Sequence, residues 1–275
     1  MYDIIEKQVL SDTVKLMKIN APLVAKKAQP GQFIILRINE EGERIPLTIA
    51  DFDRKQGTIT IIFMEVGKTT KELGKLKEGD HLLNFLGPLG TPSEIKNYGT
   101  VICIGGGVGI APLYPIIKAL KQQGNKIISI LGARSKDLLL LEDEIQQHSD
   151  HLYITTDDGS KGHKGFVSDI LQQFIDKDMQ IDLVMAIGPV IMMKVVAQLT
   201  KKYNIKTLVS LNPIMVDGTG MCGGCRVTVG DKVKFACVDG PEFDGHLVDF
   251  DNLMLRNRRF LTHENHACKL KGVTQ

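Results

Sequence analysis

The feature that most constrains the fold of this chain is a regular alternation of apolar strands with amphipathic helices, which begins at Tyr98. The predicted strands and helices follow one another as TVICIGG (100–106), APLYPIIKALKQQG (111–124), KIISILG (126–132), LLLLEDEIQQH (138–148), LYITTDDG (152–159), FVSDILQQFI (166–175), LVMAIG (183–188), VIMMKVVAQLTKKY (190–203) and TLVSLN (207–212). Consecutive parallel strands need crossover helices, which cover both faces of a sheet. Residues 98–210 are therefore predicted to form an α/β domain with a parallel five-stranded sheet.

Residues 1–97 have a different pattern, in which short β-rich segments are separated by glycines. The segments IIEKQVL, VKLMKI, QFIILRI and TITIIFMEV are rich in branched aliphatic residues, and only KTTKELGKL predicts a helix. Such a run predicts a small antiparallel barrel. The later alternation stops near Leu211, so residues 211–275 are predicted to form a third, cysteine-bearing module.

The overall composition excludes several classes of function. Of the 275 residues, 43% are hydrophobic and 24% are charged, as in ordinary globular proteins, and the formal net charge is +2. That charge favours neither nucleic acid nor a membrane surface as a partner. The N-terminus lacks a stretch of signal-peptide type, and no apolar run reaches the roughly 18 residues of a membrane span. Five cysteines, three of them clustered, predict a cytoplasmic metal-binding protein rather than a secreted disulfide framework.

The segment CIGGGVGIAP (103–112) follows a predicted strand and opens a predicted helix. Glycines at such a turn let the backbone approach a pyrophosphate, and the helix N-terminus offers N–H groups and partial positive charge. The segment predicts a nucleotide site, although Ile110 departs from the G-x-G-x-x-G pattern and a tight turn is the alternative. Cys103, inside the strand, is interpreted as a core residue. The nucleotide-binding candidates here and in the loops after the next strands are Gly105, Gly106, Gly107, Gly109, Arg134, Ser135, Asp157, Gly188 and Pro189, although TDDG (156–159) alone is also ordinary turn chemistry.

The tail contains the segment MVDGTGMCGGCRVTV (215–229), in which Cys222 and Cys225 are followed later by Cys237. The Cys-x-x-Cys spacing suits zinc as well as iron, and a fourth ligand must come from elsewhere. Asp217 is one candidate, although Asp-Gly is also a common turn pair. Cys268 in THENHACK is another, which we interpret as a spare thiol that follows two surface histidines, His263 and His266.

Five short motifs together resemble those of the ferredoxin–NADP reductase superfamily: RIPLTI (44–49), EVGKTT (65–70), GPLG (87–90), GGGVGIAP (105–112) and GARS (132–135). In that superfamily an antiparallel barrel holds FAD and an α/β domain binds the nicotinamide nucleotide. The resemblance implies that Arg44 pairs with the FAD pyrophosphate and that Thr48 acts at the reacting edge of the flavin. The other flavin contacts that it implies are Pro46, Leu47, Gly67, Thr69 and Thr70.

The cysteine module restricts the resemblance to those members of the superfamily that have a C-terminal [2Fe–2S] module. The sequence resembles the electron-transfer subunits of dihydroorotate dehydrogenase. It resembles more closely the small (alpha) subunits of NADH-dependent reduced ferredoxin:NADP oxidoreductase, which are also called sulfide dehydrogenase subunits. The dihydroorotate subunits have a cysteine where this chain has Asp217, whereas aspartate is a feature of the second group. The resemblance thus implies a cluster held by Asp217, Cys222, Cys225 and Cys237.

The same resemblance implies an electron-transfer function. Hydride would pass between NAD(H) and FAD, and single electrons would pass through the cluster to a larger subunit with its own flavin and iron–sulfur clusters. Arg134 and Ser135 could hold a 2′-phosphate, so NADP(H) stays possible although the family favours NAD(H). The alternatives are the electron-transfer subunit of dihydroorotate dehydrogenase and a non-catalytic binding protein with a zinc site.

Overall fold

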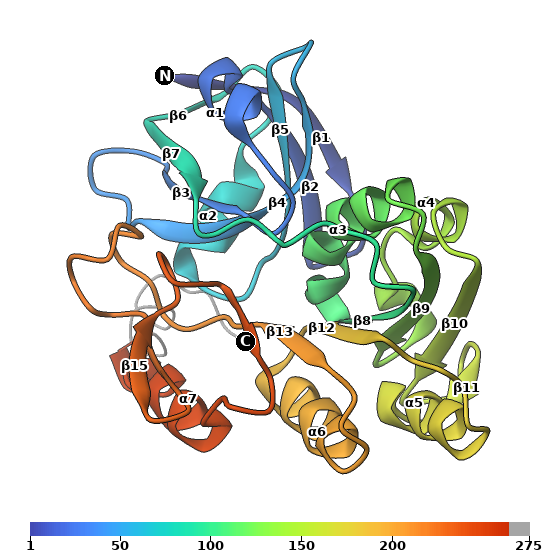
Figure 1. Ribbon diagram of the computed structural model, residues 1–275. Coiled ribbons are helices and arrows are strands. Elements are labelled where there is room, and N and C mark those ends of the chain that lie inside the picture. Colours follow the sequence, from blue (N-terminus) through green and yellow to red (C-terminus); the bar gives the residue numbers. More distant parts are fainter. Residues whose placement is uncertain (264–275) are drawn as a thin grey trace.

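A computed structural model describes residues 1–263 of the chain and shows three parts (Figure 1). An N-terminal sheet curls into a nearly closed barrel, a second sheet lies beside it with helices on both faces, and a C-terminal module packs against both. Within the described residues no helix is long and apolar enough to cross a membrane.

The barrel sheet is antiparallel and its strands follow the order β6-β1-β2-β5-β4-β3-β7. Its strands are β1 (Tyr2–Val9), β2 (Val14–Asn20), β3 (Phe33–Arg37), β4 (Ile45–Asp53), β5 (Thr58–Met64), β6 (His81–Leu82) and β7 (Asn84–Leu89). Two helices accompany them, α1 (Pro22–Lys27) and the predicted α2 (Lys68–Lys75). The sequence analysis did not predict α1, whose six residues begin at a proline in the first turn and are too few for a helical period to show.

The second sheet contains the five predicted parallel strands in the order β10-β9-β8-β12-β13, with one short strand added at each edge. Its strands are β8 (Thr100–Gly106), β9 (Lys126–Ala133), β10 (His151–Thr156), β11 (His163–Lys164), β12 (Leu183–Ile187), β13 (Thr207–Ser210) and β16 (Glu242–Asp244). Its helices are α3 (Ile110–Gln122), α4 (Glu142–Gln147), α5 (Val167–Asp176) and α6 (Val190–Lys201). The predicted α/β architecture is confirmed.

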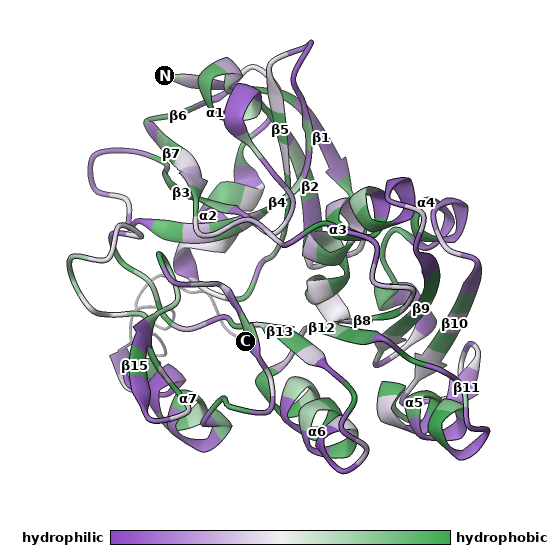
Figure 2. Ribbon diagram, viewed as in Figure 1, coloured by the Kyte–Doolittle hydropathy of each residue, from purple (hydrophilic) through white to green (hydrophobic). Residues whose placement is uncertain are grey.

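The period of two along β8 explains why helices cover both faces of this sheet. Val101 and Cys103 pack with α3 and α4, whereas Ile102 and Ile104 pack with α5 and α6. Figure 2 shows the hydrophobic residues gathered in these central strands and on the inner sides of the helices. Cys103 is fully buried, as expected for a core residue, and burial raises its pKa to about 12.

The C-terminal module consists of a hairpin, an edge strand and one helix. The hairpin is β14 (Arg226–Val229) with β15 (Lys232–Phe235), and the helix is α7 (Phe250–Asn257). Strand β16 does not join the hairpin but pairs antiparallel with β13, with Val209 opposite Phe243. The module is therefore built into the second sheet as well as lying beside it.

A junction under the module also ties it to the barrel. The Thr91 hydroxyl donates to the Val238 carbonyl at 3.0 Å, and the Thr91 N–H donates to the Gly240 carbonyl at 2.7 Å. The Ser93 hydroxyl donates to the carboxyl group of Glu242. Burial raises the pKa of Glu242 to about 7, with the hydrogen bond from Ser93 opposing the shift. These contacts fix where the cysteine segment sits against the barrel.

Candidate cofactor sites

The glycine loop lies at the point where the strand order of the second sheet reverses. Strands β9 and β12 flank β8 on opposite sides, and Gly105 of β8 pairs with Ile187 at the end of β12. Open parallel sheets leave a crevice at such a reversal, at the carboxyl ends of the strands. The structure thus brings the predicted 105–109 and 188–189 segments together at one crevice.

The glycines of this loop have different local requirements. A Cβ on Gly109 would lie 2.5 Å from the Ile187 carbonyl oxygen, and one on Gly106 would lie 2.5 Å from the Met192 sulfur. Gly109 is therefore needed for close packing against backbone, whereas a side chain at position 106 would have to displace the Met192 side chain. Gly107 has φ +54° and open space where a side chain would be, so its backbone can be approached from outside. Among the three, Gly107 is the position best suited to a pyrophosphate.

The remaining nucleotide candidates lie at the same edge of the sheet. Arg134 and Ser135 follow β9, and Asp157 follows β10, with its N–H bonded to the Ala133 carbonyl at 3.1 Å. Arg134 and Asp157 are both exposed. They are placed where the far end of a bound nucleotide would extend from the crevice.

The flavin motif lies on β4 of the barrel. Arg44 is exposed just before the strand, and Thr48 is opposite Phe33 of β3, with Pro46 opposite Ile35. The loop before β4 reaches the N-terminus of α2, because the buried Thr69 hydroxyl donates to the Glu43 carboxylate. Arg44 therefore lies in a segment tied directly to that helix terminus.

The backbone at the N-terminus of α2 is suited to binding a phosphate. The Thr70 hydroxyl oxygen accepts hydrogen bonds from the Val66 and Gly67 N–H groups, each at 3.0 Å. A Cβ on Gly67 would meet no atom within 4 Å, so the backbone there is open to a ligand. A helix N-terminus beside an exposed arginine suits a pyrophosphate. Thr70 acts in this structure on its own helix end rather than toward the open side.

Helix α3 links the two predicted nucleotide sites. It begins at the glycine loop and packs its apolar face on barrel residues that include Ala50 and Ile62. Lys118 of α3 also forms an ion pair with Asp51 of β4 at 3.1 Å. Strand β4, which contains the flavin motif, is therefore in direct contact with the helix that begins at the glycine loop.

The predicted thiol ligands lie in and beside one loop. Cys225 and Cys237 are buried, with their sulfurs 3.1 Å apart, whereas Cys222 is exposed. The Gly224 N–H donates to the Cys222 sulfur at 3.4 Å. Burial, followed by the contact with Cys225, raises the pKa of Cys237 to about 12, so the metal-free thiol is protonated and metal binding must release its proton.

Asp217 lies against this loop through its carboxylate. One oxygen accepts a hydrogen bond from the Thr219 N–H and the other from the Cys222 N–H, both at 2.9 Å. The Thr219 bond is the main cause that lowers the pKa of Asp217. Each oxygen keeps a second lone pair that a metal can use. The carboxylate thus has a turn-forming role whether or not it is also a ligand.

Three thiols and one carboxylate provide the four protein donors that a two-iron cluster needs. A [2Fe–2S] cluster takes two protein ligands on each iron, so its ligands are spread around a loop. Backbone N–H groups aimed at the sulfurs, such as that of Gly224, are typical of such clusters. Cys268, the alternative ligand, lies outside the described residues.

The cysteine loop and the barrel share one core. Phe33 and Ile35 of β3 belong to the same buried cluster as Cys225 and Cys237. Gly218 lies so close to the barrel that a Cβ there would be 2.8 Å from Ile35. Because β3 also pairs with the flavin motif strand, both predicted redox sites contact the same strand.

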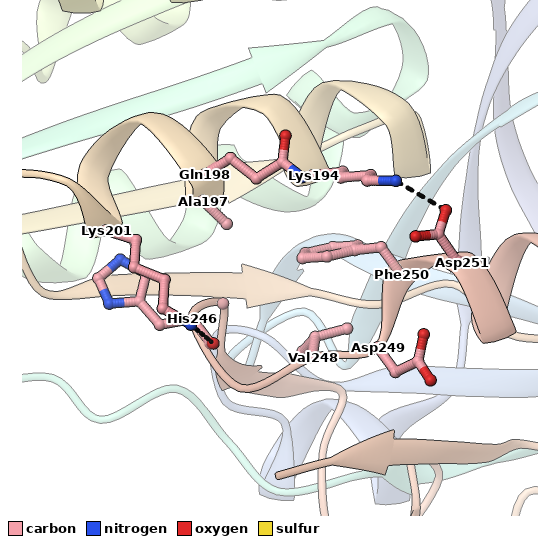
Figure 3. Close-up of a pocket in the computed structure, with 10 residues that line it drawn as sticks. Lys194, Ala197, Gln198, Lys201, His246, Val248, Asp249, Phe250 and Asp251 are labelled. Carbon is pink, nitrogen blue, oxygen red and sulfur yellow. Dashed lines mark hydrogen bonds and ion pairs between the residues drawn. The ribbon is translucent and has the colours of Figure 1, made fainter.

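A cavity of about 200 Å³ between α6 and α7 is separate from these sites (Figure 3). Its two lysines are paired within it: Lys194 with Asp251 at 2.7 Å, and Lys201 with the His246 carbonyl at 3.0 Å. No predicted site residue lines this cavity.

Several residues that shape these sites were not predicted from the sequence. Glu43 accepts a hydrogen bond from Thr69, and Lys118 forms an ion pair with the flavin motif strand. Two arginines after the hairpin donate hydrogen bonds to the cysteine loop. Glu43 adjoins the RIPLTI motif, which was a usable signal. The others act across more than 30 residues of sequence, so no local pattern reveals them.

Comparison with known proteins agrees with this geometry. The family described as the iron–sulfur cluster binding domain of dihydroorotate dehydrogenase B matches residues 212–249, and the oxidoreductase NAD-binding domain matches 103–198. A Thermotoga maritima homologue of the dihydroorotate dehydrogenase B (NAD(+)) electron transfer subunit is 51% identical, covering 95% of this chain and 92% of its own. The Fusobacterium nucleatum subunit of that name is 34% identical, covering 86% and 92%.

This chain belongs to the family of dihydroorotate dehydrogenase B electron-transfer subunits and their homologues. One solved structure, from a study of flavin-based electron bifurcation by NADH-dependent reduced ferredoxin-NADP oxidoreductase, is 49% identical with a TM-score of 0.93 and covers 98% of this chain and 97% of that one. The family assignment confirms the predicted reductase-like fold and iron–sulfur domain. It also agrees with an oxidoreductase subunit that works with a larger partner.

Proposed function

We propose that this chain passes hydride between NAD(H) and FAD and then passes single electrons through a [2Fe–2S] cluster to a larger subunit, as in the ferredoxin:NADP oxidoreductase type. We assign FAD to residues 1–97, the nicotinamide nucleotide to 98–210 and the cluster to 211–275. The partner would contain its own flavin and iron–sulfur clusters, any bifurcation would belong to the complex, and we place the protein in the cytoplasm.

One observation carries this proposal: the same strand, β3, contacts both the flavin motif strand and the cysteine loop. Thr48 and Pro46 pair with Phe33 and Ile35 of β3, and Gly218 packs on the Ile35 side chain. A binding protein with a structural metal has no need to place the metal against a second ligand site. An electron-transfer chain does need this, because its two redox groups must be close.

The chain's own residues have positioning and electrostatic tasks in this mechanism. Arg44 and the N-terminus of α2 would neutralise the FAD pyrophosphate, and Gly107 would admit that of the nucleotide. Thr48 would hydrogen-bond the reacting edge of the flavin, and α3 sets its distance from the nicotinamide site. The bound flavin supplies the two-electron to one-electron conversion, which no side chain can perform.

Electrons would leave on the side of the exposed Cys222. The side chains of Val216, Met221 and Val238 surround this loop and are 52%, 88% and 45% exposed. An exposed apolar rim beside a redox centre suits a partner subunit. We therefore place the larger subunit over this rim.

The second candidate is a dihydroorotate dehydrogenase subunit, which the names of the 51% and 34% identical relatives favour. Both candidates share the cofactors and differ in the partner. Mixing the purified chain with each type of catalytic subunit, and assaying NADH-dependent reduction of the partner flavin, separates them.

The central test is cofactor content after anaerobic purification. We expect bound FAD together with iron and acid-labile sulfide in equal amounts, and a flavin band that bleaches with NADH faster than with NADPH. Asp217→Ala should lower iron and sulfide while FAD stays bound, and Arg44→Ala should do the reverse. A colourless protein that contains zinc would overturn the proposal.

A further inference from the structure

Two arginines from the C-terminal region hold one peptide of the cysteine loop. The Gly224 carbonyl oxygen accepts a hydrogen bond from Arg256 at 3.3 Å and another from Arg259 at 3.1 Å. Arg256 also donates to the Arg226 carbonyl, and Arg259 to the Arg256 carbonyl, each at 3.1 Å. Gly224 lies between the two cysteines of the Cys-x-x-Cys segment, so both guanidinium groups act on the loop itself.

The geometry of a trans peptide gives these contacts a consequence for the ligands. The carbonyl and the following N–H of one peptide unit point in opposite directions. Because the Gly224 carbonyl points outward to the arginines, the Cys225 N–H points to the opposite side. The neighbouring Gly224 N–H already donates to the Cys222 sulfur at 3.4 Å. The arginines thus fix the orientation of a backbone that surrounds the thiolates.

The arginines also concentrate positive charge beside the cysteine loop. Burial lowers the pKa of Arg256, and so do the charges of Arg259 and Arg226. In the part of the chain that the structure describes, none of these three forms an ion pair with a carboxylate. Like charges held together repel unless an anion lies close by. Three thiolates and a carboxylate around the cluster supply such an anion.

We propose that Arg256 and Arg259 are positioning residues for the cluster, which hold the Gly224–Cys225 peptide and raise the cluster's reduction potential. The proposal rests on the function proposed above. With the cluster bound, each transfer would bring one electron from the flavin side and pass it on to the larger subunit, with no bond formed or broken. The electron adds one negative charge, and nearby positive charge stabilises that form. The arginines therefore favour acceptance of the electron from the flavin.

The experiment compares variants that keep the chain intact and differ in charge and fork geometry. Arg259→Gln and Arg256→Gln remove the charge, whereas Arg256→Lys keeps the charge without the planar donors. Arg258→Gln is the matched control, because Arg258 lies at the same helix end and is exposed, whereas the hydrogen bonds to the Gly224 carbonyl come from Arg256 and Arg259. The midpoint potential of each holoprotein is measured by redox titration followed by electron paramagnetic resonance, with iron and FAD content measured in parallel.

We expect each Gln variant to lower the ratio of reduced to oxidised cluster at least tenfold at a fixed potential, which is about 59 mV for a one-electron couple. Arg256→Lys should fall between Arg256→Gln and the wild type, and Arg258→Gln should match the wild type within error. If Arg256→Gln fails to hold iron, Arg259→Gln and Arg256→Lys decide, because Arg259 is exposed.

Two outcomes overturn the inference and are distinguishable. If the midpoint potentials of Arg256→Gln and Arg259→Gln equal that of Arg258→Gln, the arginines have only a structural role. The proposed function would then still stand. A wild-type protein with FAD but without iron and sulfide would overturn both the inference and the proposed function.

Discussion

The glycine loop at 105–109 and the cysteine loop at 217–225 are both glycine-rich, but their glycines are needed for different reasons. In the first, Gly109 is enclosed by backbone, because the Ile187 carbonyl and Gly188 lie where a side chain would be. In the second, Gly218 has φ +74° and lies against side chains of the barrel. One loop is limited mainly by the space between two strands, and the other by its own curvature and by its neighbours.

The anchoring of the two loops differs in the same way. The glycine loop is held by regular structure on both sides, since β8 precedes it and α3 follows it. The cysteine loop is held by side chains: the Asp217 carboxylate accepts from its N–H groups, and Arg256 and Arg259 hold its Gly224 carbonyl. A loop held by packing can be built before a ligand binds. A loop held by charged groups is coupled to the charge of its ligand.

The substitution with the largest expected effect is Gly109→Ala. The new methyl group must displace backbone at the end of β12, so we expect the free energy of unfolding to fall by about 3 kcal/mol. The Michaelis constant for NADH should rise as the crevice opens. Urea unfolding and steady-state kinetics test this, and a stability equal to that of the wild type would show that the crevice is not tightly packed.

Gly218→Ala tests the cysteine loop in the same manner. A left-handed φ costs an alanine about 1 kcal/mol, and the contact with Ile35 adds a comparable amount, so a loss of about 2 kcal/mol is expected. Iron content should fall, whereas FAD content should not. Equal loss of both cofactors would contradict the separation of the two sites. Retention of both with unchanged stability would contradict the close packing on the barrel.

Glu242→Gln tests the junction beneath the cysteine loop. The pKa of Glu242 is raised from 4.5 to about 7, so its carboxyl group binds a proton more tightly in the folded chain. That stabilisation is complete below about pH 4.5 and is lost as the pH rises to about 7. The neutral glutamine avoids the loss. We therefore expect the variant to match the wild type near pH 4 and to exceed it by about 1–2 kcal/mol at pH 8.

The counterpart within the glycine loop is Gly107→Ala, which should have the smallest effect on stability. Open space surrounds this position, so only the left-handed φ opposes an alanine, at about 1 kcal/mol. Nucleotide binding should respond more, with a several-fold rise in the Michaelis constant for NADH. FAD and iron content serve as the control. A larger loss of stability than that of Gly109→Ala would show that Gly107, and not Gly109, is the more tightly packed position.

Most of the fold was predictable because the hydrophobic periodicity of each strand or helix lies within one short stretch of sequence. The alternation after Tyr98 predicted every central strand of the second sheet, including the buried Val101 to Ile104 run. The short elements were not predictable. Helix α1 has six residues and β16 has three, and β16 depends on pairing with β13 from about 30 residues earlier. Pairing over that separation has no signature in either segment alone.

The candidate sites were predictable to the extent that motifs lie within one loop. Gly107, Cys222 and Cys225 stand in such motifs, whereas Cys237 follows the hairpin β14–β15 and meets Cys225 only in the assembled fold. The contacts of Lys118 with Asp51 and of Arg259 with Gly224 follow only from the assembled fold. The turn-forming contacts of Asp217 show why its chemistry cannot be read from spacing, because the same carboxylate serves a turn and is available to a metal.

Strand β16 has a consequence for how this chain can be divided. It covers the outer side of β13, where Leu208, Val209 and Ser210 each pair with a residue of the module. A truncated chain that ended before the cysteines would leave that row of backbone donors and acceptors bare. Uncovered strand edges recruit other chains, which leads to aggregation. The iron–sulfur module therefore also covers the edge of the second sheet, and a fragment without it would be prone to self-association.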